Sequence, residues 1–307
     1  MQTLYLTHPA CRLHEMGDWH PESPARLDAI SDQLLASGIM PLVQAREAPP
    51  ATAAAIERVH PRAYLERLRD AAPATGYTAL EPETLMNPHT MDAALHAAGA
   101  GVAAVDAVMA GEAQTAFCAV RPPGHHAGRD QARGFCFLNN VAIAAMHALQ
   151  AHGLQRVAII DFDVHHGNGT EEIFAGDERV LMCGIFQHPF YPHSGAEAAG
   201  ANMLNLPVPA YTGGAAVREL ITAHWLPKLQ AYRPELLLVS AGFDAHREDE
   251  LGQLGLVESD YAWITAQLVA VAERHAHGRI VSMLEGGYDL SALGRSVVAH
   301  VRELAGL

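Results

Sequence analysis

The sequence predicts an α/β protein built around a largely parallel sheet, and three observations indicate this fold class. Short apolar runs with β-branched residues alternate along the chain with longer, alanine-rich segments of helical character. The 307 residues, of which 50% are hydrophobic and 18% charged, are enough to bury a large core. No Ser-rich or Pro-rich linker and no internal repeat divides the chain, so we expect residues 1–307 to form a single domain.

Taken in chain order, TLYLT is the first predicted strand, and the following segment ATAAAIERVHPRAYLERLRD predicts helices joined at Pro61. Five later segments, rich in Ala, Gly and Val in several cases, predict helices that pack closely against a sheet. The predicted strands are 3–7, 116–120, 156–163, 179–186, 235–241 and 279–287. The predicted helices are 51–70, 91–111, 140–153, 215–232, 259–277 and 290–305.

The charge balance is acidic, with 34 Asp and Glu against 20 Lys and Arg and a formal net charge of −14. Such a surface does not favour sequence-independent binding to a phosphate backbone, so we expect no direct nucleic acid binding; a cationic substrate would suit it better. The opening residues lack the pattern of a signal peptide, and no uncharged apolar run reaches the ~20 residues of a membrane span. The four cysteines form no C-x-x-C pair. Together these features predict a soluble cytoplasmic protein, and they leave open a homo-oligomer.

Polar residues gather where four of the predicted strands end. The carboxyl ends of parallel strands meet at one edge of a sheet, where loops converge on a ligand crevice. We therefore expect a functional site at this edge. The segments that contribute to it are 121–126, 161–169, 240–244 and 285–289.

The strongest local pattern is DFDVHHGNG, which begins at Asp161. In an extended segment alternate residues point to the same side, so Asp161, Asp163 and His165 can face one way. Asp163 and His165 are then suited to hold one metal ion. With a third carboxylate from Asp244, they make three protein ligands and leave a fourth position for water, as in a catalytic zinc site.

Two further groups suit the hydrolysis of an amide, which requires an activated water, stabilisation of the oxyanion and a proton for the departing amine. His125 and His126 follow Pro-Pro-Gly, which fixes a sharp exit from the strand, and adjacent imidazoles there can share acid and base duties. Tyr288 follows two glycines, and its phenol can donate a hydrogen bond to the oxyanion from the side opposite the metal.

The ordered motifs RPPGHHA, GFCFLNN, DFDVHHGNGT, SAGFDAH and EGGYD, with HPESPAR near the start, resemble the motif series of histone deacetylases and the related bacterial acetylpolyamine amidohydrolases. The similarity covers most of the chain. It implies the arginase-deacetylase fold, a single α/β domain with a central, mostly parallel sheet. The resemblance also implies a zinc-dependent amidohydrolase that acts on an N-acyl-lysine or a similar N-acyl amine. It assigns zinc to Asp163, His165 and Asp244, acid and base catalysis to His126, electrostatic support to His125, and the oxyanion contact to Tyr288.

Supporting roles follow from the same resemblance. Asp161 would orient His125, and Asn168 would lie beside His126 as in class II deacetylases, where the uncharged partner makes the histidine less basic. Asp161 and the backbone carbonyls of Asp163 and His165 would also line the family's structural potassium site. Gly184 stands where a serine hydroxyl is often found in that site.

The substrate channel of this family is walled by aromatic residues and glycine. Gly134, Phe135 and Tyr191 match those positions, with Tyr191 standing where phenylalanine is usual, and Gly287 is assigned to substrate binding with them. Two looser matches are a rim carboxylate and an arginine near the cavity behind the zinc. These are Glu83 and Arg26.

Three alternatives remain open. An acetylpolyamine amidohydrolase would share every catalytic residue, but the glutamate of polyamine-preferring relatives would fall at Leu251, which favours lysine-type substrates. A binuclear manganese hydrolase of the arginase type would need further bridging carboxylates. A non-catalytic acyl-lysine binding protein would be expected to lack a zinc ligand or Tyr288, and the sequence retains all of them.

Overall fold

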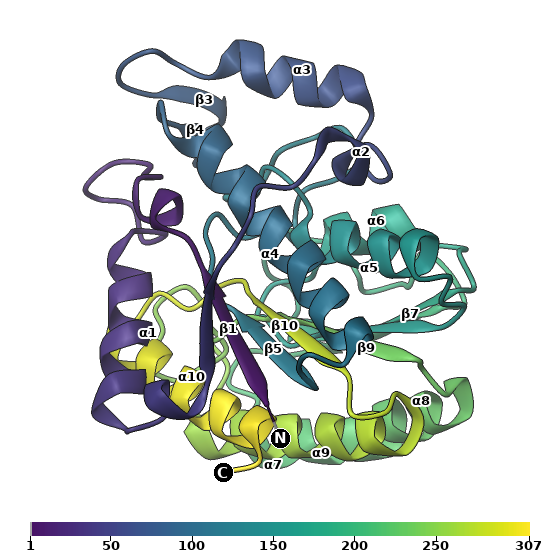
Figure 1. Cartoon of the computed structure of the whole chain (residues 1–307). Coiled ribbons are helices and arrows are strands. Elements are labelled where there is room, and N and C mark those ends of the chain that lie inside the picture. The colour runs from purple at the N-terminus through teal and green to yellow at the C-terminus, as the bar shows by residue number, and fades with distance from the viewer. Residues whose placement is uncertain (1) are drawn as a thin grey trace.

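An eight-stranded parallel sheet runs through the protein, and the computed structural model describes residues 2–307 (Figure 1). This arrangement confirms the fold class predicted from the sequence. The strands, in their order across the sheet, are β2 (Gln44–Glu47), β1 (Thr3–Thr7), β5 (Thr115–Cys118), β10 (Ile280–Leu284), β9 (Leu236–Ala241), β6 (Val157–Asp161), β7 (Val180–Gln187) and β8 (Met203–Val208). A separate antiparallel hairpin consists of β3 (Thr78–Glu81) and β4 (Thr84–Met86).

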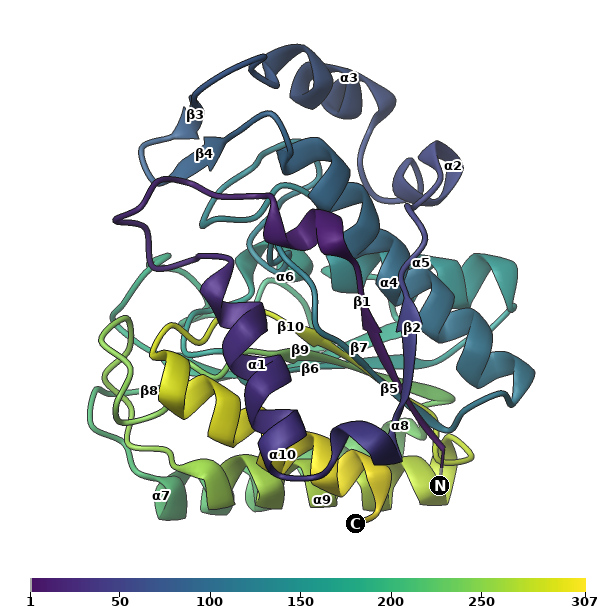
Figure 2. The same ribbon diagram turned by 60° about the vertical axis from the view of Figure 1, so that its left-hand side comes forward.

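Helices cover both faces of the sheet, as the two views of the ribbon show (Figures 1 and 2). On one face lie α4 (Thr90–Ala110) and α5 (Asn140–Ala151), with α6 (Asn168–Phe174) beside α5. On the other lie α9 (Glu258–His275) and α10 (Leu290–Ala305), flanked by α1 (Ala25–Ala36), α7 (Gly214–Leu220) and α8 (Leu226–Tyr232). The short elements are η1 (Pro9–Arg12), η2 (Met40–Leu42), α2 (Ala53–Ile56), α3 (Arg62–Ala71) and the π-helical turn η3 (Ile221–Trp225).

The central strands are continuous apolar runs because both of their faces are covered. Every residue of β5, β10, β9, β6 and β7 is buried. The side chains of these strands and the buried side chains of the surrounding helices form one hydrophobic core. The site-bearing loops therefore leave a rigid scaffold.

The predicted strands differ from the observed ones mainly at their ends and at the sheet edges. Strand β10 ends at Leu284, short of the predicted 287, and β6 ends at Asp161, short of the predicted 163. In both cases the polar motif belongs to the loop. The edge strands β2 and β8 and the β3–β4 hairpin were missed; β2 has the sequence QARE and is largely exposed, so it lacks the apolar pattern of a buried strand.

Most predicted helices are observed within two residues of their expected bounds. The segment 51–70 forms the separate helices α2 and α3, with Pro61 as the residue that precedes α3. The predicted helix 215–232 forms α7, η3 and α8 in succession. Helices α1 and α6 were missed, and α6 begins at Asn168, inside the motif that the sequence analysis treated as loop.

Helix α4 has the length and apolar composition of a membrane span, although Asp92 and Asp106 interrupt its apolar sequence. In the fold, 67% of its most apolar window is buried inside the protein. Its alanine-rich and glycine-rich faces pack against the sheet and α5. We therefore interpret α4 as a core helix.

Candidate metal centre and active site

The order of the strands explains why distant motifs meet. Strands β5, β10, β9 and β6 are direct neighbours and parallel, so the loops that follow them leave the same edge of the sheet. Those loops carry the four polar segments identified in the sequence. The structure brings together the predicted metal ligands, both histidines of the Pro-Pro-Gly loop, and Tyr288.

Three side chains form a cluster whose ligand atoms lie within 4.8 Å of one another: Asp163, His165 and Asp244. Nδ1 of His165 lies 3.0 Å from Oδ1 of Asp163 and 3.3 Å from Oδ2 of Asp244. Asp163 and Asp244 are fully buried, and His165 is 9% exposed. The side chains of Phe162 and Val164 pack into the core, so the predicted alternation holds although the strand has already ended.

The chemistry of this cluster fits a divalent cation. Backbone N–H groups of Gly286 and Val164 donate to Asp163 and Asp244 at 2.8 and 2.9 Å, which fixes both carboxylates. Oδ2 of Asp244 is buried and accepts no hydrogen bond, although His165 lies near it. Burial, and then the charge of Asp163, raise the pKa of Asp244 to about 7. Two buried carboxylates and an imidazole directed at one point match the donor set of a zinc site with three protein ligands.

Glycines allow the loops to approach these carboxylates. A Cβ atom at Gly242 would overlap the Asp163 carboxylate, and one at Gly286 would overlap that of Asp244. Gly242 directly follows β9, and Gly286 lies two residues after the end of β10. Only a residue without a side chain fits against the ligands at these two points.

His125 and His126 lie beside the cluster, with their ring centres 4.0 Å apart. Nδ1 of His125 lies 2.9 Å from Oδ2 of Asp161, and Nδ1 of His126 lies 2.8 Å from Oδ1 of Asn168. The structure therefore gives the two histidines the separate partners that the sequence predicted.

The two histidines differ in electrostatic environment. Burial opposes the charge on His125, but the carboxylates of Asp161 and Asp163 outweigh it and raise its pKa well above the usual value. Burial and the neighbouring His125 lower the pKa of His126 well below the usual value. The surroundings thus favour the charged form of His125 and the neutral form of His126.

Glu285 connects this pair to the sheet, a role that the sequence analysis did not identify. Its Oε2 accepts from the backbone N–H groups of Gly124 and His125 at 2.7 and 3.1 Å. Its Oε1 accepts from the hydroxyl of Ser240 at 3.0 Å. This buried carboxylate, which follows β10, connects the loop after β5 to the end of strand β9. Its position in the motif EGGYD was the available sequence signal.

A pocket of about 390 Å³ opens above the cluster. The predicted channel residues Gly134, Phe135, Tyr191 and Leu251 all line it, whereas Gly287 is not among its lining residues. The carbonyl of Gly287 instead accepts from Nε of Arg26 at 2.6 Å. The other residues that line the pocket are Trp19, His20, Pro21, Glu83, His126, His165, Phe190, Glu250 and Tyr288.

Aromatic rings form much of the pocket wall. The rings of Phe135 and Tyr288 meet edge to face with their centres 5.9 Å apart, and those of Tyr191 and His126 do so with their centres 5.2 Å apart. Phe190 stacks on His165 at 5.5 Å. Phe190 was not predicted as a wall residue, although it directly precedes Tyr191 in HPFYP. Its large apolar side chain next to a predicted wall residue was the available signal.

Tyr288 is held from two sides. Its backbone N–H donates to Oδ2 of Asp249 at 2.6 Å, and the guanidinium of Arg26 lies 4.9 Å from the centre of its ring. Burial and the charge of Asp244 raise the pKa of the phenol well above its usual value, so Tyr288 keeps its proton and remains a donor. Asp249 was not identified from the sequence, because nothing local shows that it reaches a loop 39 residues away.

Comparisons with known proteins identify the family. The histone deacetylase domain model matches residues 20–304, so the chain belongs to the histone deacetylase family. It is 40% identical over 295 residues to the histone deacetylase-like amidohydrolase of Pseudomonas aeruginosa, covering 94% of this chain and 77% of that protein. A probable deacetylase of Archaeoglobus fulgidus is 35% identical over 315 residues, covering 100% of this chain and 87% of that protein.

A solved structure supports the same assignment. The crystal structure of the HDA15 HD domain matches with a TM-score of 0.93 at 32% identity, over 99% of this chain and 90% of that one. The predicted fold and the predicted family resemblance are both confirmed. These relatives support a deacetylase or amidohydrolase activity.

Proposed function

We propose that this protein is a zinc-dependent deacylase that hydrolyses the amide of an N-acyl-lysine in a protein or peptide, or of a similar N-acyl amine. One observation carries the proposal: the three-ligand cluster lies at an aromatic-walled pocket that is also lined by His126, which is paired with Asn168, and by Tyr288. Each of these groups meets a separate requirement of amide hydrolysis.

Asp163, His165 and Asp244 would hold the zinc ion. A zinc ion bound there would lower the pKa of a water molecule and polarise the acyl carbonyl. The cluster itself supplies fixed carboxylates, because backbone N–H groups hold an oxygen of each one. This second layer of contacts keeps the ligands directed at one point.

His126 is suited to move the proton. Its Nδ1 donates to Oδ1 of Asn168, which leaves Nε2 with a free lone pair. Because its pKa is lowered, His126 is neutral and can take a proton from water, then return it to the departing amine. His125, held as a cation by Asp161, adds positive charge near the developing oxyanion.

Tyr288 would donate a hydrogen bond to the oxyanion. Its phenol stays protonated, and Asp249 and Arg26 fix its loop and ring. A donor fixed in advance needs no reorganisation as charge develops, which is the source of its catalytic value.

The walls of the pocket suit an acylated alkyl amine. Phe135 and Tyr191 present aromatic surface to the pocket, and Gly134 keeps one side open because a Cβ atom there would meet both His126 and Tyr191. An aliphatic linker of the lysine type would gain apolar contact along such walls.

An acetylpolyamine is the second candidate substrate, and one observation favours it. The exposed carboxylates of Glu83 and Glu250 both line the pocket, where they would attract an extended polycation. Leu251, rather than a glutamate, contacts the pocket at the position predicted to discriminate between the two substrates. We therefore place lysine-type substrates first.

Potassium and localisation remain predictions. Gly184 pairs with Asp161 between β6 and β7 and offers no side-chain oxygen to a potassium ion. All four cysteines are unpaired and buried, which is consistent with a reducing cytoplasm.

The test compares an acetyl-lysine peptide with an acetylpolyamine, using the purified, zinc-loaded protein with a chelator and a hydroxamate as controls. Chelator-sensitive turnover would support the deacylase, and the higher kcat/KM would assign the substrate. A protein that binds zinc in the pocket but hydrolyses neither substrate, nor longer acyl-lysines, would contradict the proposed activity and favour an acyl-lysine binding role.

A further inference from the structure

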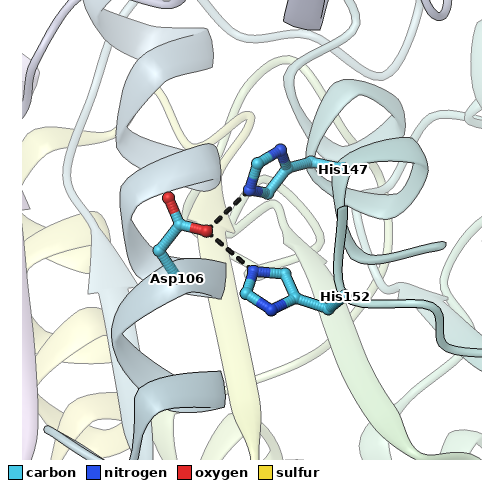
Figure 3. Close-up of side chains that lie close together, drawn as sticks. All are labelled: Asp106, His147 and His152. Atoms are coloured by element: carbon cyan, nitrogen blue, oxygen red, sulfur yellow. Dashed lines mark hydrogen bonds and ion pairs between the residues drawn. The ribbon is translucent and has the colours of Figure 1, made fainter. Parts of the chain in front are cut away.

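A second group of metal-ligating side chains lies outside the pocket, on the surface between α4 and the end of α5 (Figure 3). It consists of Asp106 from α4, His147 from α5, and His152, which caps the C-terminus of α5. Neither the family motifs nor the proposed activity uses these residues. Their ligand atoms all lie within 4.8 Å of one another, as in the catalytic cluster.

The two histidines of this group point at the same carboxylate oxygen. Nε2 of His147 and Nε2 of His152 each lie 2.7 Å from the same oxygen, Oδ1 of Asp106. The two rings meet edge to face with their centres 5.4 Å apart. The side chains of Asp106, His147 and His152 are 55%, 12% and 24% exposed, so the group is anchored in the helix interface yet open to solvent.

We propose that Asp106, His147 and His152 form a second binding site for a divalent transition-metal ion of the zinc type. Two imidazole nitrogens and a carboxylate are ligands that zinc prefers, and the solvent-exposed side leaves a fourth position for water. Around a tetrahedral zinc, with bonds near 2.1 Å, ligand atoms lie about 3.4 Å apart. The observed distances therefore need to open by less than about 1 Å, well within the freedom of surface rotamers.

Arg58 controls access to this site. Its Nη1 lies 2.8 Å from Nδ1 of His147. A guanidinium only donates, so Nδ1 of His147 accepts and its Nε2 carries the proton that is donated to Asp106. Metal binding at Nε2 requires the opposite tautomer, so Arg58 must turn away. A cavity of about 330 Å³, lined by Arg58, Asp106 and His147, provides the room.

A metal ion in this position would connect two helices that cover one face of the sheet. Asp106 lies in the last two turns of α4, His147 lies in the last two turns of α5, and His152 directly follows α5. An ion that binds the folded protein and not the unfolded chain stabilises the fold by mass action. We assign the second site a structural role and not a catalytic one.

The first experiment measures zinc content after dialysis against a small excess of zinc. The wild-type protein should retain one more equivalent per chain than His152→Ala, while His224→Ala, which alters an exposed histidine elsewhere, should match the wild type. Asp163→Ala should lose the catalytic equivalent and keep the second one, so failure at one site is distinguishable from failure at the other. Equal content in the wild type and His152→Ala would overturn the proposal.

The second experiment uses Arg58→Gln, because the amide oxygen of glutamine can accept a hydrogen bond from the Nδ1–H group of His147 and so favours the metal-binding tautomer. Since such supporting contacts change metal affinity by about 10–100-fold, we expect zinc to bind the second site roughly tenfold more tightly, measured by calorimetric titration of protein whose first equivalent is filled. Unchanged or weaker binding in Arg58→Gln would overturn the proposed role of Arg58 and of His147 as a ligand.

Discussion

At the scale of single residues, the proposed chemistry depends on groups that touch the reacting atoms and on others that only hold them in place. Asp163, His165 and Asp244 belong to the first kind: the sequence predicts them as metal ligands, and the structure brings their ligand atoms within 4.8 Å of one another. Metal ligands and acid-base groups are recognisable because few other residue types can perform their chemistry.

Residues that act through others were harder to predict. Glu285 and Asp249 bind backbone N–H groups of other loops, and a contact of this kind leaves no mark on the local sequence. Phe190 was missed because an aromatic residue in a loop is as often core as channel wall. The contacts of His125 with Asp161 and of His126 with Asn168 could be predicted, whereas those of Glu285 and Asp249 required the fold.

Tyr288→Phe tests the oxyanion role. The phenol is the group that would donate to the oxyanion, so kcat should fall about 10²–10³-fold while KM and zinc content remain close to the wild-type values. Steady-state kinetics on an acetyl-lysine peptide, with zinc measured on the same preparation, provide the readout. Wild-type turnover in the phenylalanine variant would exclude Tyr288 as the donor.

Asp249→Asn tests whether Asp249 is a positioning residue for Tyr288. Both carboxylate oxygens of Asp249 accept hydrogen bonds, one from the N–H groups of Tyr288 and Asp289 and the other from that of Leu251. Asparagine has a single side-chain oxygen, so it can keep the hydrogen bonds on one side only. A displacement of Tyr288 by about 1 Å should lower kcat by roughly 10- to 100-fold, with a smaller change in KM.

A double-mutant cycle separates this role from a general structural one. If Asp249 acts through the phenol, its substitution should cost little further turnover in a Tyr288→Phe background. Glu248→Gln, which alters only a surface pair with Arg295, serves as the matched control. Additive losses in the cycle would contradict the positioning role.

At the scale of elements, a buried charge network connects the segment before α1 to the ends of β5 and β10. Both oxygens of Glu22 contact the guanidinium of Arg121, and its Oε1 also pairs with Arg26 at 3.0 Å. Arg26 in turn donates to the carbonyls of Glu285 and Gly287. All of these side chains are fully buried, so the removal of one charge leaves the others uncompensated.

Glu22→Gln should therefore lower the free energy of unfolding by about 3–5 kcal/mol, measured by urea denaturation. Glu66→Gln, which breaks an exposed pair with Arg62 on α3, should leave the free energy of unfolding nearly unchanged, because water screens such a pair. A loss of stability in Glu22→Gln no larger than that of Glu66→Gln would contradict a structural role for the network.

The network also predicts a direction of pH dependence. Burial alone would raise the pKa of Glu22, but Arg121, His14 and Arg26 hold it well below the usual 4.5. The ionised Glu22 therefore contributes fully to the free energy of unfolding above pH 4.5. This contribution is lost as the pH falls through the lowered pKa that Glu22 has in the folded protein. The stability difference between the wild type and Glu22→Gln should narrow in acid, and a constant difference would contradict this reasoning.

At the scale of the whole molecule, the fold class followed from the alternation of apolar and alanine-rich segments, and most central elements were placed correctly. The errors concern the edges of the sheet and the helices α1 and α6. Strand β2 carries charged residues because one of its sides faces solvent, so its sequence resembles a loop. Helix α6 begins within the DFDVHHGNG motif, where glycine and asparagine favour a turn as readily as a helix start.

The spatial order of the strands could not be predicted from the sequence. Strands β5, β10, β9 and β6 lie side by side although β5 and β10 are more than 160 residues apart, and this order brings the four polar loops to one point. The predicted convergence at the carboxyl edge is correct because it follows from parallel pairing alone. Which loops are neighbours depends on packing across the whole core.

The most direct test of the central claim is the addition of zinc to metal-stripped protein, with turnover of an acetyl-lysine peptide and bound zinc measured on the same samples. The account predicts no turnover without metal, recovery that follows occupancy of the catalytic site in the wild type and in His152→Ala, and no recovery in Asp163→Ala. Full turnover by the stripped protein, or recovery in Asp163→Ala, would contradict a catalytic zinc ion held by Asp163, His165 and Asp244.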